Sequence, residues 1–523
     1  MKAARVGTII TLLGLVHNTH GFPSYGFSIV SPRPQMTNGV WDARNDFAWI
    51  YQNQVKPSHL FDLSLNFAQS FLPEELATII FGASCIRISG SALPNRDDQD
   101  LMADQFGLSP SFASTATFTP QYRSVVIPAT AIFDLDAYLG CHAYFRATIP
   151  FVWSSTNLNV TEDIATPGVN APFPDGYFGM GEFTTPLTSF TQALQRNVTV
   201  GALNVPLNAG RITCEQSDSQ LANMIFDLGF NPIFDDDHSF GLFARVVSPN
   251  GNRPHSTYLF EPFVGNGHHW ELGLGIKGHQ RIWCGDGDNE FSIYLALVGT
   301  HVFKARQRRS FDLCKNGFWS RYLLVKTFDD AGNATGNLAP LINYSTLSCK
   351  VKANFQLDGV FMATYLDHGL HFDFGYEVYL RTQEKIELLE CLPSNLGLKG
   401  VQNVYDMTSP LPLNDTESTA TIFGPSLDEQ SFVVDVPSPR LLSTGQLNLK
   451  SAASPQILTQ KFFTYLGYQW DCLHRGKSIQ PYIGFGLEVE FQSGNEAEAP
   501  IYDVDNNTLS QWNFQWRGGF LFG

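Results

Sequence analysis

The sequence predicts an all-β fold in which about 16 antiparallel strands, within a range of about 14 to 18, close into a transmembrane barrel with long loops. Three observations support this prediction. Apolar and polar residues alternate along much of the chain, charged residues make up only 16% of it, and no stretch reaches 18 uninterrupted apolar residues. Such a chain has few charges to cover a water-facing surface, and it must cross a membrane with strands if it crosses one.

The first 21 residues have the features of a secretory signal peptide. Lys2 and Arg5 give a positive start, and residues 6–16 form an apolar run. A helix that crosses a membrane needs about 20 residues, so we favour export and cleavage near Gly21 over a membrane anchor. Without Lys2 and Arg5 the chain has 31 basic and 49 acidic residues, a net charge of −18, which argues against a nucleic-acid partner.

The mature chain divides into an N-terminal segment and a barrel. Residues 22–60 have no strong period and are expected to form either a periplasmic segment or a plug. Residues 61–523 carry the strands, with long polar loops near 153–210 and 383–432 and a short helical stretch over 383–392. Loops of this length are often functional. They are predicted to narrow the lumen or cap the outer mouth, and mobile surface loops are the alternative.

Two hairpins show the alternation most clearly. In the first, Leu272, Leu274 and Ile276 are expected to face lipid, and the return strand over 289–300 repeats the pattern. The second combines residues 349–361 with 370–381. At about 3.3 Å per residue, the 12-residue strand over 370–381 spans a bilayer even when tilted.

The last strand, residues 512–522, alternates an aromatic face with a polar one. Trp516 and Phe520 are assigned to lipid and Arg517 to the lumen. This arrangement is typical of the closing strand of a barrel.

Charged residues on the inward faces are the candidate pore-lining residues. Charges that pointed into hydrocarbon would be costly, so they indicate a water-filled or plugged interior. Six are basic and six are acidic, so the wall alone gives no strong ion selectivity. They are Glu271, Lys277, Arg281, Lys350, Lys352, Asp358, Asp373, Glu377, Arg381, Glu488, Glu490 and Arg517.

A basic run follows one of the predicted wall strands. It contains Lys304, Arg306, Arg308 and Arg309. Because arginine pairs with phosphate in a fork, the run is predicted to contact lipopolysaccharide phosphates or to line the pore mouth. Solvated charge at the barrel rim is the alternative.

Motifs for catalysis or cofactor binding are absent from the sequence. It has no HExxH, GxSxG or Walker motif and no strand-GxGxxG-helix unit. The eight cysteines show no CxxC or zinc spacing, and His268 and His269 beside Glu271 match no standard metal site. We therefore expect no enzyme activity, no metal and no cofactor.

The chain resembles Gram-negative outer-membrane porins in its signal peptide, its repeated strands and the aromatic Phe522 near its end. It also looks like the porin-like proteins of intracellular bacteria such as chlamydiae. The resemblance is architectural, and Gly523 after the last aromatic residue departs from the usual ending. It implies an outer-membrane location and contacts with outer-membrane lipid and lipopolysaccharide. It also implies recognition of the last strand by the barrel-assembly machinery and leaves open whether protomers form a homotrimer.

The leading hypothesis is passive diffusion of small hydrophilic solutes or ions through a water-filled barrel. A second hypothesis is an outer-membrane adhesin or structural surface barrel whose long loops bind a partner. A third is a soluble secreted β-sandwich that acts as a binding protein or hydrolase. The outward aromatic faces discriminate the first and third, because they contact lipid only in a barrel.

Overall fold

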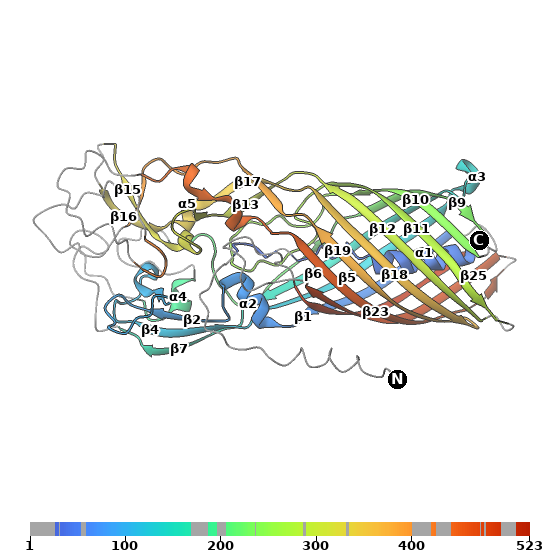
Figure 1. Ribbon diagram of the computed structural model, residues 1–523, viewed down its shortest axis with the longest axis horizontal. Helices are drawn as coiled ribbons and strands as arrows, with labels where there is room; N and C mark the ends of the chain where they lie inside the picture. Colours follow the sequence, from blue (N-terminus) through green and yellow to red (C-terminus); the bar gives the residue numbers. More distant parts are fainter. Residues whose placement is uncertain are drawn as a thin grey trace, which may run out of the picture.

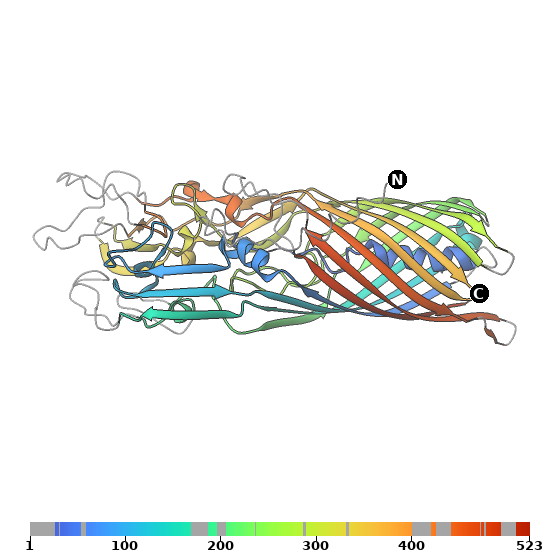
Figure 2. The same ribbon diagram turned by 60° about the horizontal axis from the view of Figure 1, so that its bottom comes forward.

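The structure is a computed structural model of the chain. It describes residues 27–30, 32–53, 59–168, 187–195, 206–235, 237–285, 289–330, 334–399, 420–424, 441–470, 472–474, 477–492 and 509–522. The predicted signal peptide therefore lies outside the described residues. The molecule is elongated, with a β-barrel at one end and a body built from the connecting loops at the other (Figures 1 and 2). We call this second body the loop domain.

Twelve antiparallel strands form the barrel, and it closes where β26 pairs with β1 and β23 pairs with β25. Two shorter strands, β8 (Gln216–Leu221) and β24 (Cys472–His474), extend the sheet at its ends. In chain order the barrel strands are β1 (His59–Ser70), β5 (Gln121–Asp134), β6 (Tyr144–Asn157), β9 (Ile225–Phe234), β10 (His238–Val247), β11 (Glu271–Cys284), β12 (Asn289–Val302), β18 (Phe355–Asp367), β19 (Leu370–Arg381), β23 (Ile457–Gln469), β25 (Lys477–Gln492) and β26 (Gln511–Phe522).

The prediction of about 16 strands is therefore wrong in number, although the closed antiparallel barrel is confirmed. Several alternating segments lie in the loop domain instead of the wall. Residues 85–89 and 324–328 form such strands, and so do residues 346–353. A strand that covers a protein core alternates just as a lipid-facing strand does, so the pattern of one segment does not separate the two.

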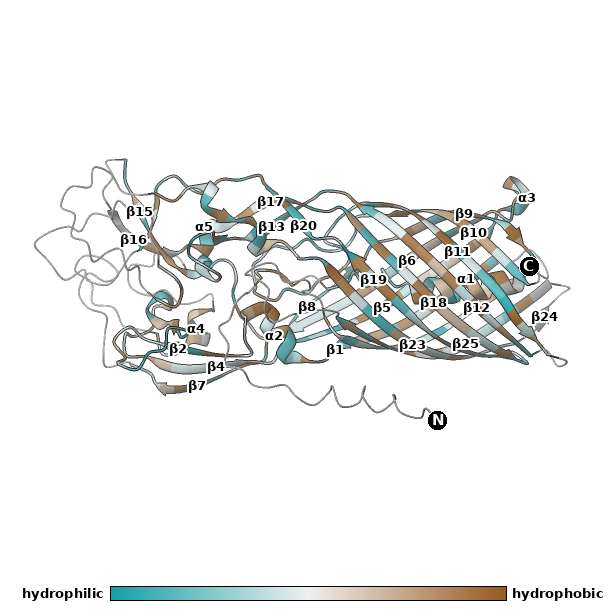
Figure 3. Cartoon of the chain, viewed as in Figure 1, coloured by the Kyte–Doolittle hydropathy of each residue, from teal (hydrophilic) through white to brown (hydrophobic). Residues whose placement is uncertain are grey.

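The two faces of the barrel wall have opposite character. Figure 3 shows apolar and polar residues alternating along the barrel strands. Leu274 is 73% exposed and Trp516 is 55% exposed, whereas the inward-facing Lys277 and Arg517 are buried. This arrangement confirms the predicted outward apolar and inward polar faces, and the closed barrel excludes a β-sandwich fold.

The two ends of the barrel differ in the length of their connections. At one end the strands are joined by short turns, among them the two residues His368 and Gly369 between β18 and β19. Both residues have positive φ, 47° and 84°, as a two-residue type I′ hairpin turn requires. The β5–β6 connection at this end carries α3 (Asp136–Leu139). We call this the short-turn end, and β26 finishes there.

The opposite, long-loop end carries the loop domain. Its strands are β2 (Cys85–Ser89), β3 (Leu101–Met102), β4 (Ala113–Phe118), β7 (Val160–Thr166), β13 (Ala305–Ser310), β14 (Asp312–Leu313), β15 (Leu324–Phe328), β16 (Ala334–Pro340), β17 (Thr346–Ala353), β20 (Glu384–Leu388), β21 (Leu396–Leu398) and β22 (Leu447–Asn448). They form small sheets in the orders β3-β2-β4-β7, β13-β17-β20, β16-β15-β21 and β14-β22. Its helices are α2 (Pro73–Phe81), α4 (Phe190–Ala193) and α5 (Ile342–Ser345), with 3₁₀ turns at Ala103–Phe106, Ser320–Tyr322, Thr444–Gln446 and Leu449–Ala452.

A hydrophobic core shared by these loops holds the loop domain together. Phe81, Phe118 and Trp319 lie in it, and the first two stack with ring centroids 3.8 Å apart. The predicted helical stretch over 383–392 is wrong, because Glu384–Leu388 forms β20. The cysteines whose side chains are described are all unpaired, so no disulfide is found among them.

No helix among the described residues is long and apolar enough to cross a membrane.

Candidate functional site

The barrel lumen contains the chain's own N-terminal segment. Helix α1 (Gly39–Asn53) lies inside the barrel in both ribbon views (Figures 1 and 2). Residue 27 belongs to the loop-domain core, and α1 leads toward the short-turn end, where β1 begins. Its apolar side chains, among them Val40, Phe47 and Trp49, are buried against the inner wall.

Glycines on neighbouring strands make room for the rings on the inner wall. A Cβ placed on Gly275 would lie 2.2 Å from the ring of Phe243, and one on Gly229 would lie 2.5 Å from the ring of Tyr144. The rings occupy the space that side chains would need, and they pack against apolar side chains of α1.

Four acidic residues on one side of the barrel wall bind the start of the N-terminal segment. We call Asp358, Glu377, Glu488 and Glu490, from β18, β19 and β25, the acidic wall. Arg33 pairs with three of these carboxylates at nitrogen–oxygen distances of 2.9, 2.5 and 3.1 Å. The fourth, Glu488, accepts hydrogen bonds from Asn38 and Trp41.

The acidic wall also caps α1. The Gly39 amide donates to Glu377 at 2.7 Å and to Asp358 at 3.1 Å. Carboxylates at this position satisfy an otherwise unpaired amide and stabilise the positive end of the helix dipole. Lys461 on β23 bridges Glu377 and Glu488 at 2.8 and 3.3 Å, so part of the wall charge is balanced within the wall.

Three basic residues on the other side of the lumen contact acidic side chains of α1. We call Arg146, Arg245 and Lys277, from β6, β10 and β11, the basic wall. Asp42 and Asp46 are four residues apart and therefore lie on one helix face. Asp42 accepts from Arg245 at 2.6 Å, and Asp46 lies 3.2 Å from Arg146 and 3.1 Å from Lys277.

Ion pairs between wall residues balance further charges in the lumen. Asp227 lies opposite both Arg146 and Arg245 in the β-ladders and pairs with each of them. Arg517 pairs with Asp62 at 2.6 Å and also contacts Asn45 of α1. The helix therefore presents acidic residues to the basic wall, while Arg33 just before it meets the acidic wall.

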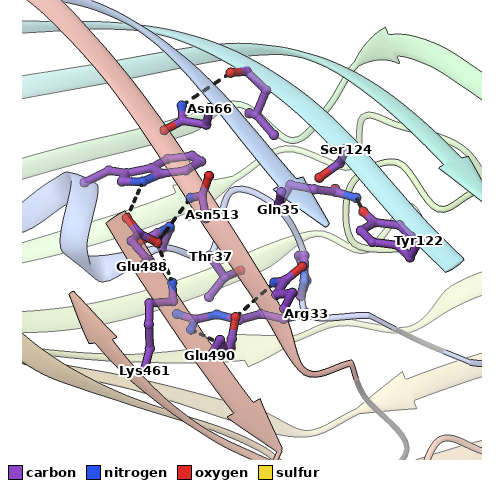
Figure 4. A pocket seen from close by; sticks show the side chains of 16 residues that line it. Arg33, Gln35, Thr37, Asn66, Tyr122, Ser124, Lys461, Glu488, Glu490 and Asn513 are labelled. Carbon is purple, nitrogen blue, oxygen red and sulfur yellow. Dashed lines mark hydrogen bonds and ion pairs between the residues drawn. The ribbon is translucent and has the colours of Figure 1, made fainter. Parts of the chain in front are cut away.

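Two small cavities, of about 40 and 20 Å³, lie where the described part of the segment meets the wall, the first between Arg33, Asn66, Tyr122 and Glu488 (Figure 4). A single water occupies at least about 10–15 Å³ of such volume. These cavities hold one to a few waters, and neither has room for a sugar-sized solute.

Nine of the twelve predicted pore-lining residues lie buried at the inner wall, although their pore-lining role itself stays a prediction. They are Glu271, Lys277, Asp358, Asp373, Glu377, Arg381, Glu488, Glu490 and Arg517. Arg281 lies at the short-turn rim, where it pairs with Asp237 at 2.5 Å. Lys350 and Lys352 do not join them, because the run over 349–361 divides at Asn354 into β17 and β18 and only β18 belongs to the barrel.

Several residues of the site were not singled out from the sequence. They are Arg33, Asp42, Asp46, Arg146, Asp227, Arg245 and Lys461. The spacing of Asp42 and Asp46 between apolar residues was the available signal for a helix with one acidic stripe. Among the described residues, no group of three or more histidine, cysteine, aspartate or glutamate side chains could hold a metal ion.

A junction between lumen and loop domain contains the buried His269. Its Nδ1 lies 2.6 Å from the Phe303 carbonyl oxygen and its Nε2 lies 3.2 Å from the Gln307 amide nitrogen. A neutral ring fits both contacts if Nδ1 donates and Nε2 accepts. Burial lowers the pKa of His269 to about 4, which keeps the ring neutral at pH 7.

A closed antiparallel barrel with an apolar outer band and charged residues in its lumen defines a transmembrane β-barrel protein. No family model matches the chain, and no curated protein matches it.

Solved structures show similar barrels. An outer-membrane channel from Pseudomonas putida F1 is 7% identical with a TM-score of 0.34, and the match covers 89% of this chain and 96% of that one. A FadL homologue from Pseudomonas aeruginosa is 7% identical with a TM-score of 0.28 and coverage of 96% and 98%. The transport unit of the autotransporter AIDA-I from Escherichia coli is 8% identical with a TM-score of 0.20 and coverage of 94% and 100%. These values are too low to transfer a function.

Proposed function

We propose that the protein is an outer-membrane channel for small hydrophilic solutes or ions, and that residues 32–53 form a plug that closes it in the conformation described above. Bacterial barrels have short periplasmic turns and longer extracellular loops. By this rule the short-turn end faces the periplasm and the loop domain lies at the cell surface. The last strand, whose aromatic residues face lipid, is the proposed signal for the barrel-assembly machinery.

The proposal rests on the ion pairs that join Arg33 to the acidic wall and Asp42 and Asp46 of α1 to the basic wall. Barrels of about 8 strands are filled by their own side chains, whereas barrels of 16 to 18 strands leave an aqueous channel. Here twelve strands enclose a helix, and a helix with its side chains is about 10–12 Å across. Departure of α1 would leave an opening of about that width, lined by the charged residues of the acidic and basic walls.

The buried ion pairs between the plug and the two walls suit a plug that moves. Buried ion pairs contribute less to stability than apolar packing of the same volume, because both charges lose their hydration. When α1 leaves, the charges of both walls regain water. A purely apolar lumen would instead expose apolar surface to the water in the pore. The plug can therefore be held in a defined register and still be released at moderate cost.

The charges of the open wall would favour cations slightly. Without the plug, eight carboxylates face six basic groups among the described residues of the inner wall between the rims. The carboxylates are Asp62, Asp227, Glu271, Asp358, Asp373, Glu377, Glu488 and Glu490, and the basic groups are Arg146, Arg245, Lys277, Arg381, Lys461 and Arg517. The excess is small, so neutral sugars and amino acids also fit the proposed channel.

Planar-bilayer recordings test the proposal. We expect the wild-type protein to be closed most of the time, with brief steps of uniform size and a weak cation preference in a salt gradient. Proteoliposomes should take up small sugars but exclude solutes wider than about 10–12 Å, the width of the displaced helix. A folded protein that gives no steps and no uptake even after release of α1 would contradict the channel.

A second candidate function is a surface anchor, and one observation favours it. The larger of the two hydrophobic cores belongs to the loop domain, so much of the chain's folding serves a body outside the barrel. In that case the barrel would hold the loop domain at the surface and α1 would never leave. A plug-weakening variant that remains folded and silent in bilayers would support this alternative.

A further inference from the structure

A small sheet carries the barrel wall beyond its rim. Strands β13, β17 and β20 pair with one another, and each is separated by only one or two residues from a barrel strand, β12, β18 and β19 respectively. In Figure 3 they lie next to the end of the barrel. This sheet therefore lies directly at the barrel rim.

One face of this sheet is basic. Along β13, Arg306 and Arg308 are exposed, while the alternate residues Gln307 and Arg309 are buried. The ladders place residues of β17 and β20 beside them on the same face. The resulting set, which we call the basic face, is Lys304, Arg306, Arg308, Lys350, Lys352 and Lys385.

Two cross-strand pairs on the basic face join like charges, whereas a third places Lys350 opposite Glu387. Arg306 lies directly opposite Lys350, and Lys352 lies directly opposite Lys385. Like charges at such positions destabilise a sheet. Among the described residues, no ion pair involves these four side chains. The sheet therefore keeps a repulsive arrangement on an exposed surface, although the chain as a whole has a net charge of −16.

Two carboxylates lie at this surface and feel its positive field. Glu387 pairs with Lys304 at 2.8 Å, and Glu390 accepts from the Ser348 amide. The hydrogen bond from Lys304 and the charges of Lys304 and Lys350 hold the pKa of Glu387 below its usual range. Among the described residues of this surface, six cations face two acids, so the surface is suited to bind further anions.

The lower part of the basic face lies at the height of a lipid headgroup layer. Phe303 and Phe355, which are 43% and 41% exposed, mark the end of the apolar band on β12 and β18. Lys304 follows Phe303 directly, and Arg306 is three residues beyond it. At about 3.3 Å per residue, the cations extend from the rim to roughly 16 Å above it. Headgroups of the outer leaflet occupy roughly the first 5–8 Å of this zone, next to the hydrocarbon core.

We propose that the basic face binds the phosphate groups of the phosphorylated glycolipid in the outer leaflet. This inference rests on the proposed outer-membrane location of the barrel, with the long-loop end outside. The arginines offer paired N–H donors to phosphate, and the lysines add charge without a fixed geometry. The face runs up from the lipid band and presents its charges sideways, where a neighbouring lipid headgroup lies.

The experiment measures lipid retention by the full-length protein folded in uncharged detergent. Micelles that contain bisphosphorylated lipid A are added, and bound lipid is counted by native mass spectrometry. The test variant is Arg306→Gln/Lys350→Gln/Lys352→Gln. The matched control, Arg87→Gln/Lys315→Gln/Lys326→Gln, removes the same number of charges from other parts of the loop domain.

We expect the wild type and the control variant to retain lipid A and the test variant to bind it about a hundredfold more weakly, since each cation near an anionic headgroup contributes about fivefold. Without lipid, the test variant should be at least as heat-stable as the wild type, because it loses like-charge pairs. Equal retention by the test variant would overturn the inference. Equal binding of dephosphorylated lipid A would overturn it too, as would displacement of lipid A by excess inorganic phosphate, which indicates a small-anion site.

The channel is tested separately from this face. Bilayers without lipid A leave the basic face empty, so conductance there reports only on the barrel and its plug. A wild type that retains lipid A but never conducts would contradict the channel and support the basic face. A test variant that conducts normally and loses lipid A would assign the loss to the basic face alone.

Discussion

Arg33 is the residue whose loss should release the plug most directly. Its guanidinium contacts Asp358, Glu377 and Glu490, and its side chain is only 4% exposed. In Arg33→Gln, Glu377 keeps Lys461 as a cation, and Glu377 and Asp358 keep the Gly39 amide, but all three carboxylates lose the guanidinium. The closed state then contains carboxylates whose charge is poorly balanced and poorly hydrated.

The size of the effect follows from the cost of breaking a buried pair. Removal of one partner typically costs about 3–5 kcal/mol, and we take the lower value because Lys461 and a glutamine amide remain. With a tenfold change for each 1.4 kcal/mol, about 3 kcal/mol lowers the ratio of closed to open channels about a hundredfold. Lysine at this position keeps the charge but loses the fork, so Arg33→Lys should lie between the two.

Single-channel recording measures this ratio as the fraction of time spent open. Wild type, Arg33→Lys and Arg33→Gln should show a rising open fraction with the same step size, because the pore width is set by the barrel. Heat-modifiable gel mobility checks that all three proteins are folded. The reasoning is refuted if folded Arg33→Gln has the open fraction of the wild type.

Three further predictions concern assembly and stability. Gly275→Ala should reduce the yield of folded barrel because its Cβ would collide with the Phe243 ring, whereas Gly278→Ala, whose nearest neighbour is at 3.7 Å, should fold normally; heat-modifiable mobility compares them. Deletion of residues 520–522 removes pairs with both β1 and β25, so export should continue while membrane insertion, assayed by fractionation, is lost. Burial lowers the pKa of His269 to about 4, so its contribution to stability is complete above pH 6.5 and lost as pH falls toward 4, by up to about 3 kcal/mol. In His269→Gln the unfolding temperature should depend less steeply on pH over this range, and an unchanged slope would contradict the assignment.

The sequence predicted the barrel because each wall strand is constrained on both faces. Lipid demands apolar residues outside, and the lumen takes polar residues or small ones, as in the run from Leu272 to Lys277. The same reasoning correctly placed Trp516 outside and Arg517 inside on the last strand. These features depend only on alternation within one strand.

The number of strands could not be read in this way. Residues 346–353 alternate because one face covers the loop-domain core, where Cys349 and Val351 are fully buried. Whether that face meets protein or lipid depends on partners far along the chain, here β13 and β20. The alternation therefore gave strands correctly but assigned some of them to the wrong surroundings.

The contacts between the N-terminal segment and the barrel wall could not be predicted for a similar reason. Arg33 meets Glu490 across 457 positions of sequence, and Asp42 meets Arg245 across 203. No local pattern reports such pairs. A helix enclosed by a wall is also apolar and charged on several faces, so residues 39–53 lack the single apolar stripe of a surface helix.

A reversible tether between α1 and the wall tests the central claim most directly. A Cβ on Gly39 would lie 2.5 Å from Cγ2 of Val360, so cysteines at these positions are close enough for a disulfide. The pair Gly39→Cys/Val360→Cys is placed in the Arg33→Gln protein and recorded in bilayers before and after reduction. We expect no conductance steps while the disulfide is intact and conductance steps after it is reduced. Equal conductance in the oxidised and reduced protein would show that solutes pass without movement of α1.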